Sequence, residues 1–354
     1  MTSAPLRVDT ASESDRPGWD AFVAARPEGD VLQLWAWGDV AAITGERPAR
    51  IAARGPDGAI RGLAQALVRR TSFGRSILYV PHGPLWDRDS PEAPVVLAVL
   101  LGGLRELARS IGGIVVKVDP RSNGEDATTV ARVMHAAGLR RARFDLQARL
   151  TQVATITSDA DSRLQSWTSN ARNLARRAAK EGTLVDVTRG VDRVAIEQFA
   201  RLHARTASRA GFRAHSAAFL ERLAGSLELP AGWYLATARA HGQPIAGMVV
   251  LRVADRAYYL YGALERDAPP HSNGSYAAMA AIFDVLADDG VRTFDLWGVD
   301  DPEDPRADPG WAGFGAFKRH FGGADLRHPG TFDLVVDRAW WRLRDWRERV
   351  AARP

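Results

Sequence analysis

The apolar and polar positions along the chain predict the same series of elements twice. In the first half, short amphipathic helices at 19–25 and around 32–43 come before a hairpin, a strand, a loop, a long helix and an apolar strand. These later elements are expected at 50–54 and 60–70 for the hairpin, then at 76–80, 93–110 and 113–118. Pro56 and Gly58 supply the backbone angles that the hairpin turn requires.

The second half repeats this order. A hairpin turned at His241-Gly242 is followed by a strand, a long helix and a closing strand, expected at 233–240, 245–253, 257–263, 275–288 and 293–297. Such an internal repeat indicates a duplicated domain. The order of elements is typical of GNAT-type acyltransferase domains, which is an analogy of fold and not of activity. The predicted fold class is therefore α/β (α+β), with two tandem GNAT-like domains whose sheets are mixed and largely antiparallel.

The expected domains are residues 1–152 and 153–354. Between the two repeats, 159–219 is predicted to be mostly helical, with breaks at Gly182 and Gly190, and we assign this basic segment (160–220) to the second domain. With 354 residues, 46% hydrophobic and 25% charged, the chain has the composition of an ordinary globular protein of two domains.

Composition excludes some chemistry and leaves other chemistry open. The chain has no cysteine, which excludes thiol catalysis and Cys-ligated zinc, and its histidines show no metal-ligand spacing, so we expect no metal. No segment resembles a signal peptide or a membrane span, and we expect a cytoplasmic protein. The net charge of +5 and the pI near 9.8 suit a polyanionic partner, but Arg-rich composition from a GC-rich genome explains them equally well.

Four stretches of sequence carry the clearest functional signal. They are Leu32-Gln-Leu-Trp-Ala-Trp-Gly38, Tyr79-Val-Pro-His-Gly-Pro-Leu-Trp-Asp87, Thr206-Ala-Ser-Arg-Ala-Gly-Phe212, and Phe294-Asp-Leu-Trp-Gly298 followed by Gly313-Phe-Gly-Ala-Phe-Lys-Arg-His-Phe-Gly-Gly323. In this order they resemble motifs of the Fem family, which includes the FemA, FemB and FemX peptidoglycan-bridge transferases. The resemblance extends over nearly the whole chain.

The resemblance implies an aminoacyltransferase. Fem-type enzymes move an amino acid from an aminoacyl-tRNA to an amine of a peptidoglycan precursor, so aminoacyl-tRNA is expected as a co-substrate and no other cofactor is expected. The acceptor would be UDP-linked or lipid-linked muropeptide. We further expect a monomer that is cytoplasmic, with peripheral contact at the inner face of the membrane.

Lys318 is the predicted catalytic residue. It lies between Phe317 and Phe321 and before two glycines, so its ammonium is expected on an apolar frame where partial desolvation strengthens its field. Aminoacyl transfer passes through a tetrahedral oxyanion, which a fixed cation stabilises. The alternative is a solvated loop lysine whose stem lies on the two rings. Phe317 is grouped with the substrate-binding residues.

Four further residues are predicted to bind substrate. Arg209 offers a planar fork for phosphate or carboxylate, and Asp87 could accept hydrogen bonds from the acceptor amine. Outside the resemblance, each is more often a member of a surface ion pair or a turn cap. Tyr259 and Tyr261 alternate along one predicted strand, so both are expected on the face that lines the substrate cleft, although core packing is an alternative for at least one of them.

A basic stripe is the predicted tRNA-binding surface. In a helix expected at 164–181, Arg172, Arg176 and Lys180 fall four residues apart on one face, opposite an apolar face. Such a stripe suits the phosphates of tRNA, which are bound by charge and shape more than by sequence. A solvated helix face has the same pattern.

Other features bear on the acceptor and on competing functions. Ala41 stands where Fem proteins often carry a lysine thought to hold substrate phosphate, which argues against a nucleotide-linked acceptor. An N-acyltransferase with another acyl donor remains an alternative, but Pro269 and Pro270 lack the N–H groups that cradle the pyrophosphate of coenzyme A. A non-catalytic tRNA- or precursor-binding protein is the third possibility.

The aromatic and basic tail 340–347 is expected to pack on the second domain or to touch a membrane interface.

Overall fold

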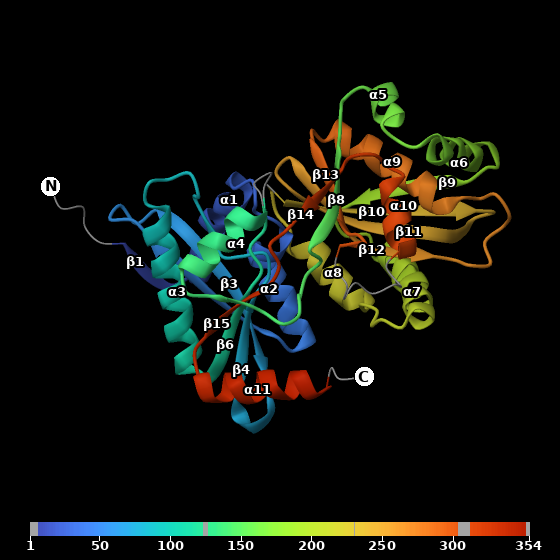
Figure 1. The fold of residues 1–354 in the computed structure, drawn as a ribbon. Coiled ribbons are helices and arrows are strands. Elements are labelled where there is room, and N and C mark those ends of the chain that lie inside the picture. The colour runs from blue at the N-terminus through green and yellow to red at the C-terminus, as the bar shows by residue number, and fades with distance from the viewer. Residues whose placement is uncertain (1–5, 123–126, 230, 304–311, 352–354) are drawn as a thin grey trace. The chain divides into compact units, whose positions relative to one another are not determined.

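A computed structural model describes residues 6–122, 127–229, 231–303 and 312–351 (Figure 1). The chain forms two compact units: unit 1 comprises residues up to 149 together with 327 onward, and unit 2 comprises 150–326. Each unit is built on one mixed sheet that carries helices, and the expected tandem fold is confirmed.

Unit 1 has strands from both ends of the chain. Its helices and strands are β1 (Arg7–Thr10), α1 (Arg16–Ala25), α2 (Trp35–Ala41), β2 (Arg47–Arg54), β3 (Ile60–Arg70), β4 (Ser76–Val80), β5 (Leu85–Trp86), α3 (Ala93–Ser110), β6 (Gly113–Val118), α4 (Ala127–Ala136), β7 (Arg140–Arg141), β15 (Phe332–Val335) and α11 (Arg338–Ala351). The sheet has the order β1-β2-β3-β4-β6-β15-β7, and β5 pairs with β3. The strands β4 and β6 are parallel, and they stay paired from Ser76 to Val80.

Alternation along the strands separates the two faces of this sheet. One face packs on α3 and α4 through residues such as Ala66, Leu78 and Val116. On the other face, Ile77, Ile114 and Val115 pack against Trp340 and Trp341 of α11. The C-terminal tail therefore packs on unit 1, and the expectation that it packs on the second domain is wrong. Contact of this tail with a membrane interface stays a prediction.

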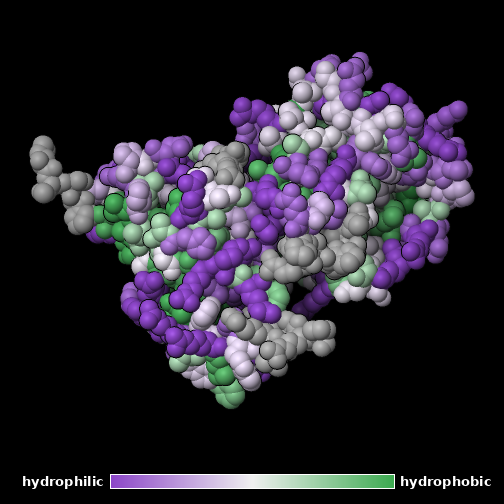
Figure 2. All heavy atoms as spheres, viewed as in Figure 1, coloured by the Kyte–Doolittle hydropathy of each residue, from purple (hydrophilic) through white to green (hydrophobic). Residues whose placement is uncertain are grey.

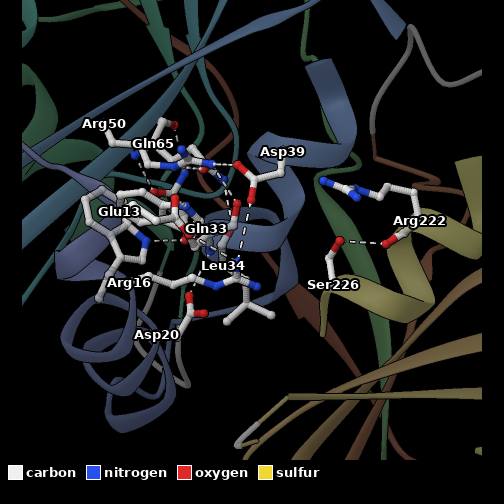
Figure 3. Close-up of polar contacts among 12 residues, drawn as sticks. Glu13, Arg16, Asp20, Gln33, Leu34, Asp39, Arg50, Gln65, Arg222 and Ser226 are labelled. Carbon is white, nitrogen blue, oxygen red and sulfur yellow. Dashed lines mark hydrogen bonds and ion pairs between the residues drawn. The ribbon is translucent and has the colours of Figure 1, made fainter. Parts of the chain in front are cut away.

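The first recognised motif holds α2 on the sheet (Figure 3). The buried amide of Gln33 donates to the carbonyls of Gln65 and Pro81, and its oxygen accepts the N–H of Gln65. Arg50 donates to Gln65, to the Trp35 carbonyl and to a carboxylate of α2, and its guanidinium lies 3.9 Å from the Trp35 ring centroid. A Cβ at Gly38 would lie 2.3 Å from the Gln65 Oε1 atom, so the motif requires glycine there.

Unit 2 contains the second repeat. Its helices and strands are β8 (Leu150–Thr155), α5 (Ala160–Gln165), α6 (Ser169–Lys180), β9 (Leu184–Arg189), α7 (Arg193–Ala210), α8 (Ala217–Ser226), β10 (Ala231–Ala240), β11 (Gln243–Val253), β12 (Arg256–Leu264), α9 (Gly274–Asp288), β13 (Thr293–Gly298), α10 (Ala312–Arg319) and β14 (Ala324–Arg327). The sheet has the order β14-β8-β13-β12-β11-β10-β9. Helices α6 and α9 cover one face, and α7 and α8 cover the other (Figure 1).

The structure differs from the sequence expectations in three places. The chain crosses between units at 149/150 rather than 152/153, and residues from 327 onward return to unit 1, because β15 pairs with both β6 and β7. The segment between Gly182 and Gly190 is the edge strand β9, which pairs with β10. The helix expected at 164–181 is broken, because the Thr168 side chain accepts the Ala171 N–H and starts a new helix, α6.

Candidate active site

Two parallel strands of unit 2 separate and leave space beside the sheet. The strands β12 and β13 pair only over Arg256–Thr293, Ala257–Phe294 and Tyr258–Asp295. Beyond that point β12 continues to Leu264 paired with β11, and β13 continues separately to Gly298. In a sheet of this topology, such a separation at the carboxyl ends of parallel strands is where ligands bind.

Lys318 of α10 lies at this separation. Its ammonium donates a 2.6 Å hydrogen bond to the Gly298 carbonyl at the end of β13, and it lies 5.9 Å from the centroid of the Tyr259 ring on β12. Burial lowers the pKa of Lys318 to about 8, although the nearby carboxylate of Asp295 acts in the opposite direction. This partial desolvation agrees with the expectation from the sequence, while the catalytic role of Lys318 stays a prediction.

A bulge in β13 makes the Gly298 carbonyl available. The pairing of β13 with β8 is irregular between Asp295 and Gly298, and Trp297 has a positive φ of 66°. The buried Asp295 carboxylate accepts the Trp297 N–H at 2.8 Å and so holds this conformation. The Phe-Asp-x-x-Gly stretch thus supplies a core ring, a carboxylate that fixes the bulge, and a carbonyl for the lysine. The sequence marked the stretch but gave no sign of these separate roles.

Aromatic packing and two glycines fix α10. Phe321 is fully buried, and Phe317 lies against it with ring centroids 4.9 Å apart. Gly322 and Gly323 both have positive φ, and a Cβ on Gly323 would lie 2.1 Å from the Val153 carbonyl oxygen of β8. Phe317 also contacts the Tyr276 ring of α9, so packing accounts for its position. A role for Phe317 in binding substrate stays a prediction.

Tyr259 and Tyr261 lie on opposite faces of the sheet, and the prediction that they share one face is wrong. A β-bulge shifts the register of β12, so that Tyr259 pairs with Val250 and Tyr261 pairs with Val249. Paired residues share a face, and consecutive residues of β11 alternate. Tyr259 therefore packs in the core on the α9 side, near Lys318, and burial raises its pKa to about 12.

Tyr261 lies in a second aromatic group on the α7 and α8 side. Its ring centroid is 4.6 Å from that of His215 and 5.8 Å from that of His203. Burial lowers the pKa of His203 to about 4, so its ring is neutral at pH 7. Its buried Nδ1 atom has no hydrogen-bond partner among the described residues. Nothing in the sequence indicated this aromatic group, because only the fold brings both histidines beside Tyr261.

Arg209 closes the far end of β12. It donates to the Leu264 carbonyl at 2.5 Å and to the Thr206 hydroxyl at 3.4 Å, while its side chain remains exposed. Gly211 ends α7 in the left-handed conformation, which explains the glycine of this motif. Leu264 is five residues beyond Tyr259, which is about 17 Å along an extended strand. Arg209 and Lys318 therefore belong to two different places on β12.

Asp87 belongs to unit 1 and forms an ion pair. Its carboxylate lies 2.7 Å from Nη1 of Arg26, and this hydrogen bond lowers the pKa of Asp87. The surface ion pair named as the alternative for Asp87 is therefore present, and binding of the acceptor amine stays a prediction. Ala41, where a lysine was expected from the resemblance, is buried at the end of α2.

The basic stripe is shorter than predicted. Arg172 donates to the carbonyls of Trp167, Gln165 and Leu164 at 2.5, 3.2 and 3.3 Å, so it caps the end of α5. Arg176 and Lys180 are exposed on α6, and neither has an ion-pair partner in the described part of the chain. These two residues are the part of the stripe that is free to meet phosphate.

The geometry also bears on metals and cofactors. Within the described ranges there is no cluster of three or more side chains that could hold a metal ion. The loop before α9 contains Pro269 and Pro270, and the Ser272 N–H donates to the Pro269 carbonyl at 3.2 Å. This loop therefore offers few free N–H groups to a pyrophosphate.

Comparison with known proteins defines the class first. A family model described as "Acetyltransferase (GNAT) domain" matches residues 165–306, which contain most of the strands of unit 2. This match and the separated strands indicate that unit 2 is an acyltransferase domain of the GNAT type.

Comparisons that cover nearly the whole chain narrow the similarity further. The chain is 25% identical over 92% of its length to the lipid II:glycine glycyltransferase of Staphylococcus aureus, of which it covers 92%. Its fold is similar to the crystal structure of FemX, with a TM-score of 0.80 and 21% identity over 95% of this chain and 99% of that one. It is also similar to L-PGS from Bacillus licheniformis, with a TM-score of 0.59, 14% identity, and coverage of 97% of this chain and 99% of that one. Over nearly its whole length, the chain is therefore similar to a peptidoglycan-precursor transferase in sequence and to FemX in fold.

We predict that Asp295→Asn lowers the pKa of Lys318 below about 8. The amide keeps the oxygen that accepts the Trp297 N–H but removes the negative charge that favours the ammonium. The pKa can be followed by NMR titration of the lysine side-chain signals. Asp300→Asn is the matched control, because Asp300 pairs with Arg319 instead. An unchanged Lys318 pKa in Asp295→Asn would show that burial alone sets it.

Proposed function

We propose that this protein transfers an aminoacyl group from aminoacyl-tRNA to an amine of a lipid-linked peptidoglycan precursor. The observation that carries the proposal is the partly buried Lys318, whose ammonium binds the Gly298 carbonyl where β12 and β13 separate. The similarity over 92% of the chain to a protein named lipid II:glycine glycyltransferase supports it.

The reaction needs charge stabilisation more than covalent chemistry. The acceptor amine attacks the ester carbonyl of the donor, a C–N bond forms, and the carbonyl oxygen becomes an oxyanion. When the intermediate collapses, the C–O bond to the ribose breaks, and the proton lost by the amine is taken up at the ribose oxygen. A lysine with a pKa near 8 is mostly protonated at neutral pH, so Lys318 can stabilise the oxyanion.

The proposed acceptor is lipid-linked rather than nucleotide-linked. The named relative acts on lipid II, and the buried Ala41 has no cation to offer a nucleotide diphosphate. Such an acceptor implies that the protein works in the cytoplasm at the inner face of the membrane. Among the residues that the structure describes, no helix is long and apolar enough to span a bilayer.

The proposed donor is aminoacyl-tRNA rather than coenzyme A. The exposed Arg176 and Lys180 suit backbone phosphates, while the proline-bearing loop before α9 disfavours a pyrophosphate cradle. A purely binding function fits less well, because a desolvated lysine costs stability that a non-catalytic protein has no reason to retain.

The direct test is incubation of the protein with a charged tRNA pool and either lipid-linked or UDP-linked precursor, followed by mass spectrometry of the peptide. We expect the lipid-linked peptide to gain the mass of one or more amino acids, and acetyl-CoA to give no acetylated product. Acetylation of the peptide without tRNA would contradict the proposal and would show that the protein is an N-acetyltransferase. The absence of product with every donor would favour a binding protein.

Lys318→Met should lower kcat by roughly 10²- to 10³-fold if the ammonium stabilises the oxyanion, since that is the usual loss for one such group. Methionine keeps the apolar stem, so folding should survive. If Lys318 instead holds the tRNA terminus before the reaction, KM for charged tRNA should rise while kcat stays nearly the same. Arg319→Met is the neighbouring control, because Arg319 forms partly exposed ion pairs with Asp300 and Asp325 and makes no hydrogen bond or cation–π contact with Gly298 or Tyr259 among the described residues. If Lys318→Met turned over at the wild-type rate, the motif around Lys318 would have a structural role and no catalytic one.

The pH profile gives an independent reading of the same residue. If the charged form is the active one, kcat should fall as pH rises through about 8, because Lys318 then loses its proton. Lys318→Arg keeps a positive charge at these pH values, so any residual activity should lack this fall.

Reversing the charges of Arg176 and Lys180 to Glu should weaken tRNA binding for every tRNA sequence. The slope of log K against log salt should decrease in magnitude by about 1.4 to 1.8, as two phosphate contacts are lost. KM for the acceptor should change little. The control is Arg193→Glu with Arg201→Glu, which makes the same change in net charge on α7, where both arginines already form surface ion pairs. An equal loss in the control would assign the effect to net charge rather than to α6.

A further inference from the structure

The C-terminal helix of unit 1 has apolar side chains that point away from the protein. Trp340 and Trp341 of α11 pack on the sheet, whereas Leu343 is 46% exposed and Trp346 is 60% exposed. Ala339, Leu343 and Trp346 are spaced by four and three residues, so they form one stripe along the helix. An amphipathic surface helix normally turns its apolar stripe inward, and here a second stripe faces out.

A hairpin tip extends the same apolar surface. Phe73, between β3 and β4, is 80% exposed and has a φ of 62°, and its ring centroid lies 6.0 Å from that of Trp340. A groove of about 300 Å³ lies between this tip and α11, lined in part by Phe73, Leu343 and Arg347. Figure 2 shows apolar surface at the tip of the β3–β4 hairpin, next to the hydrophilic surface of α11.

Arginines flank the outward stripe. Arg338 and Arg342 lie on one side of it and Arg347 on the other, and all three are exposed. No carboxylate among the described residues pairs with any of them. The nearby Asp337 is bound to Arg75, so it does not neutralise them.

We infer that α11 and the β3–β4 tip form a surface that docks on a membrane containing anionic lipids. The aromatic and aliphatic side chains would enter the interface, and the arginines would meet lipid phosphates. Each basic residue near an anionic surface adds a modest electrostatic attraction, which acts together with the apolar contact. This surface belongs to unit 1 and does not depend on which donor or acceptor unit 2 uses.

Binding of the full-length protein to vesicles tests the inference. We expect sedimentation with phosphatidylcholine vesicles that contain 30% phosphatidylglycerol, weaker binding at high salt, and little binding to phosphatidylcholine alone. Arg342→Glu with Arg347→Glu should weaken binding by about 10-fold or more. Phe73→Asn with Trp346→Gln should weaken it similarly, and Asn tolerates the left-handed conformation at position 73.

Helix α4 of the same unit provides matched controls. Arg132→Glu and Val133→Gln change an exposed arginine and a 42% exposed valine, and neither should affect vesicle binding. Equal losses in these controls would overturn the docking surface, and so would a wild-type protein that binds neither vesicle. So would a wild-type dimer that Phe73→Asn with Trp346→Gln converts to a monomer, because the face would then be a contact between copies.

Activity separates this inference from the proposed function. Transfer to an acceptor without its lipid should be unchanged in the α11 variants, because none of their residues belongs to the site around Lys318. Vesicle binding without transfer would leave the docking surface standing and the proposed function in doubt. Transfer without vesicle binding would support the proposed function and contradict the docking surface.

Discussion

The desolvated ammonium of Lys318 constrains the structure around it. Partial burial of a cation is costly unless neighbouring groups replace the water it loses. Three groups do so here: the Gly298 carbonyl, the Tyr259 ring and the carboxylate of Asp295. The carbonyl is available only because β13 bulges, and α10 can approach only because Gly322 and Gly323 lie against Ser166 and β8. The structure around the lysine therefore restricts which residues are tolerated, through backbone conformation as well as through side-chain contacts. A cation held in this way has a fixed position. Stabilisation of a charge that develops during a reaction requires such a fixed group.

The two repeats share a fold but differ where chemistry would occur. In unit 1, the parallel strands β4 and β6 remain paired to Val80 and Val118, and the Asp119 N–H continues the ladder to the Val80 carbonyl. In unit 2, the equivalent strands separate after Tyr258 and Asp295. Unit 1 therefore has no comparable gap in the described strands. The two repeats thus differ in whether their two parallel strands stay paired to the end: they separate in unit 2 and stay paired in unit 1. The surface of unit 1 also carries α11 with its outward-facing apolar side chains.

The sequence predicted the elements well where patterns are local. The strands at 76–80 and 113–118 and the helix at 93–110 match to the residue, because apolar runs and loop residues mark their ends. The predicted faces of Tyr259 and Tyr261 were wrong because a bulge adds one residue without any change in residue type. Lys318 was found from its motif, but its partner is a carbonyl, and backbone atoms leave no mark in a sequence. Arg172 was misplaced because the break at Thr168 turns it toward the carbonyls of α5.

The strand order also determines when each unit can be completed during synthesis. Because β15 lies between β6 and the edge strand β7, the sheet of unit 1 lacks a strand until residues 332–335 have left the ribosome. All the strands of unit 2 precede them in the chain. Domains usually fold in order from the N-terminus during synthesis. In this chain the order is reversed at the final step. The sheet of unit 2 can be completed first, and the sheet of unit 1 is completed only after β15 has been synthesised.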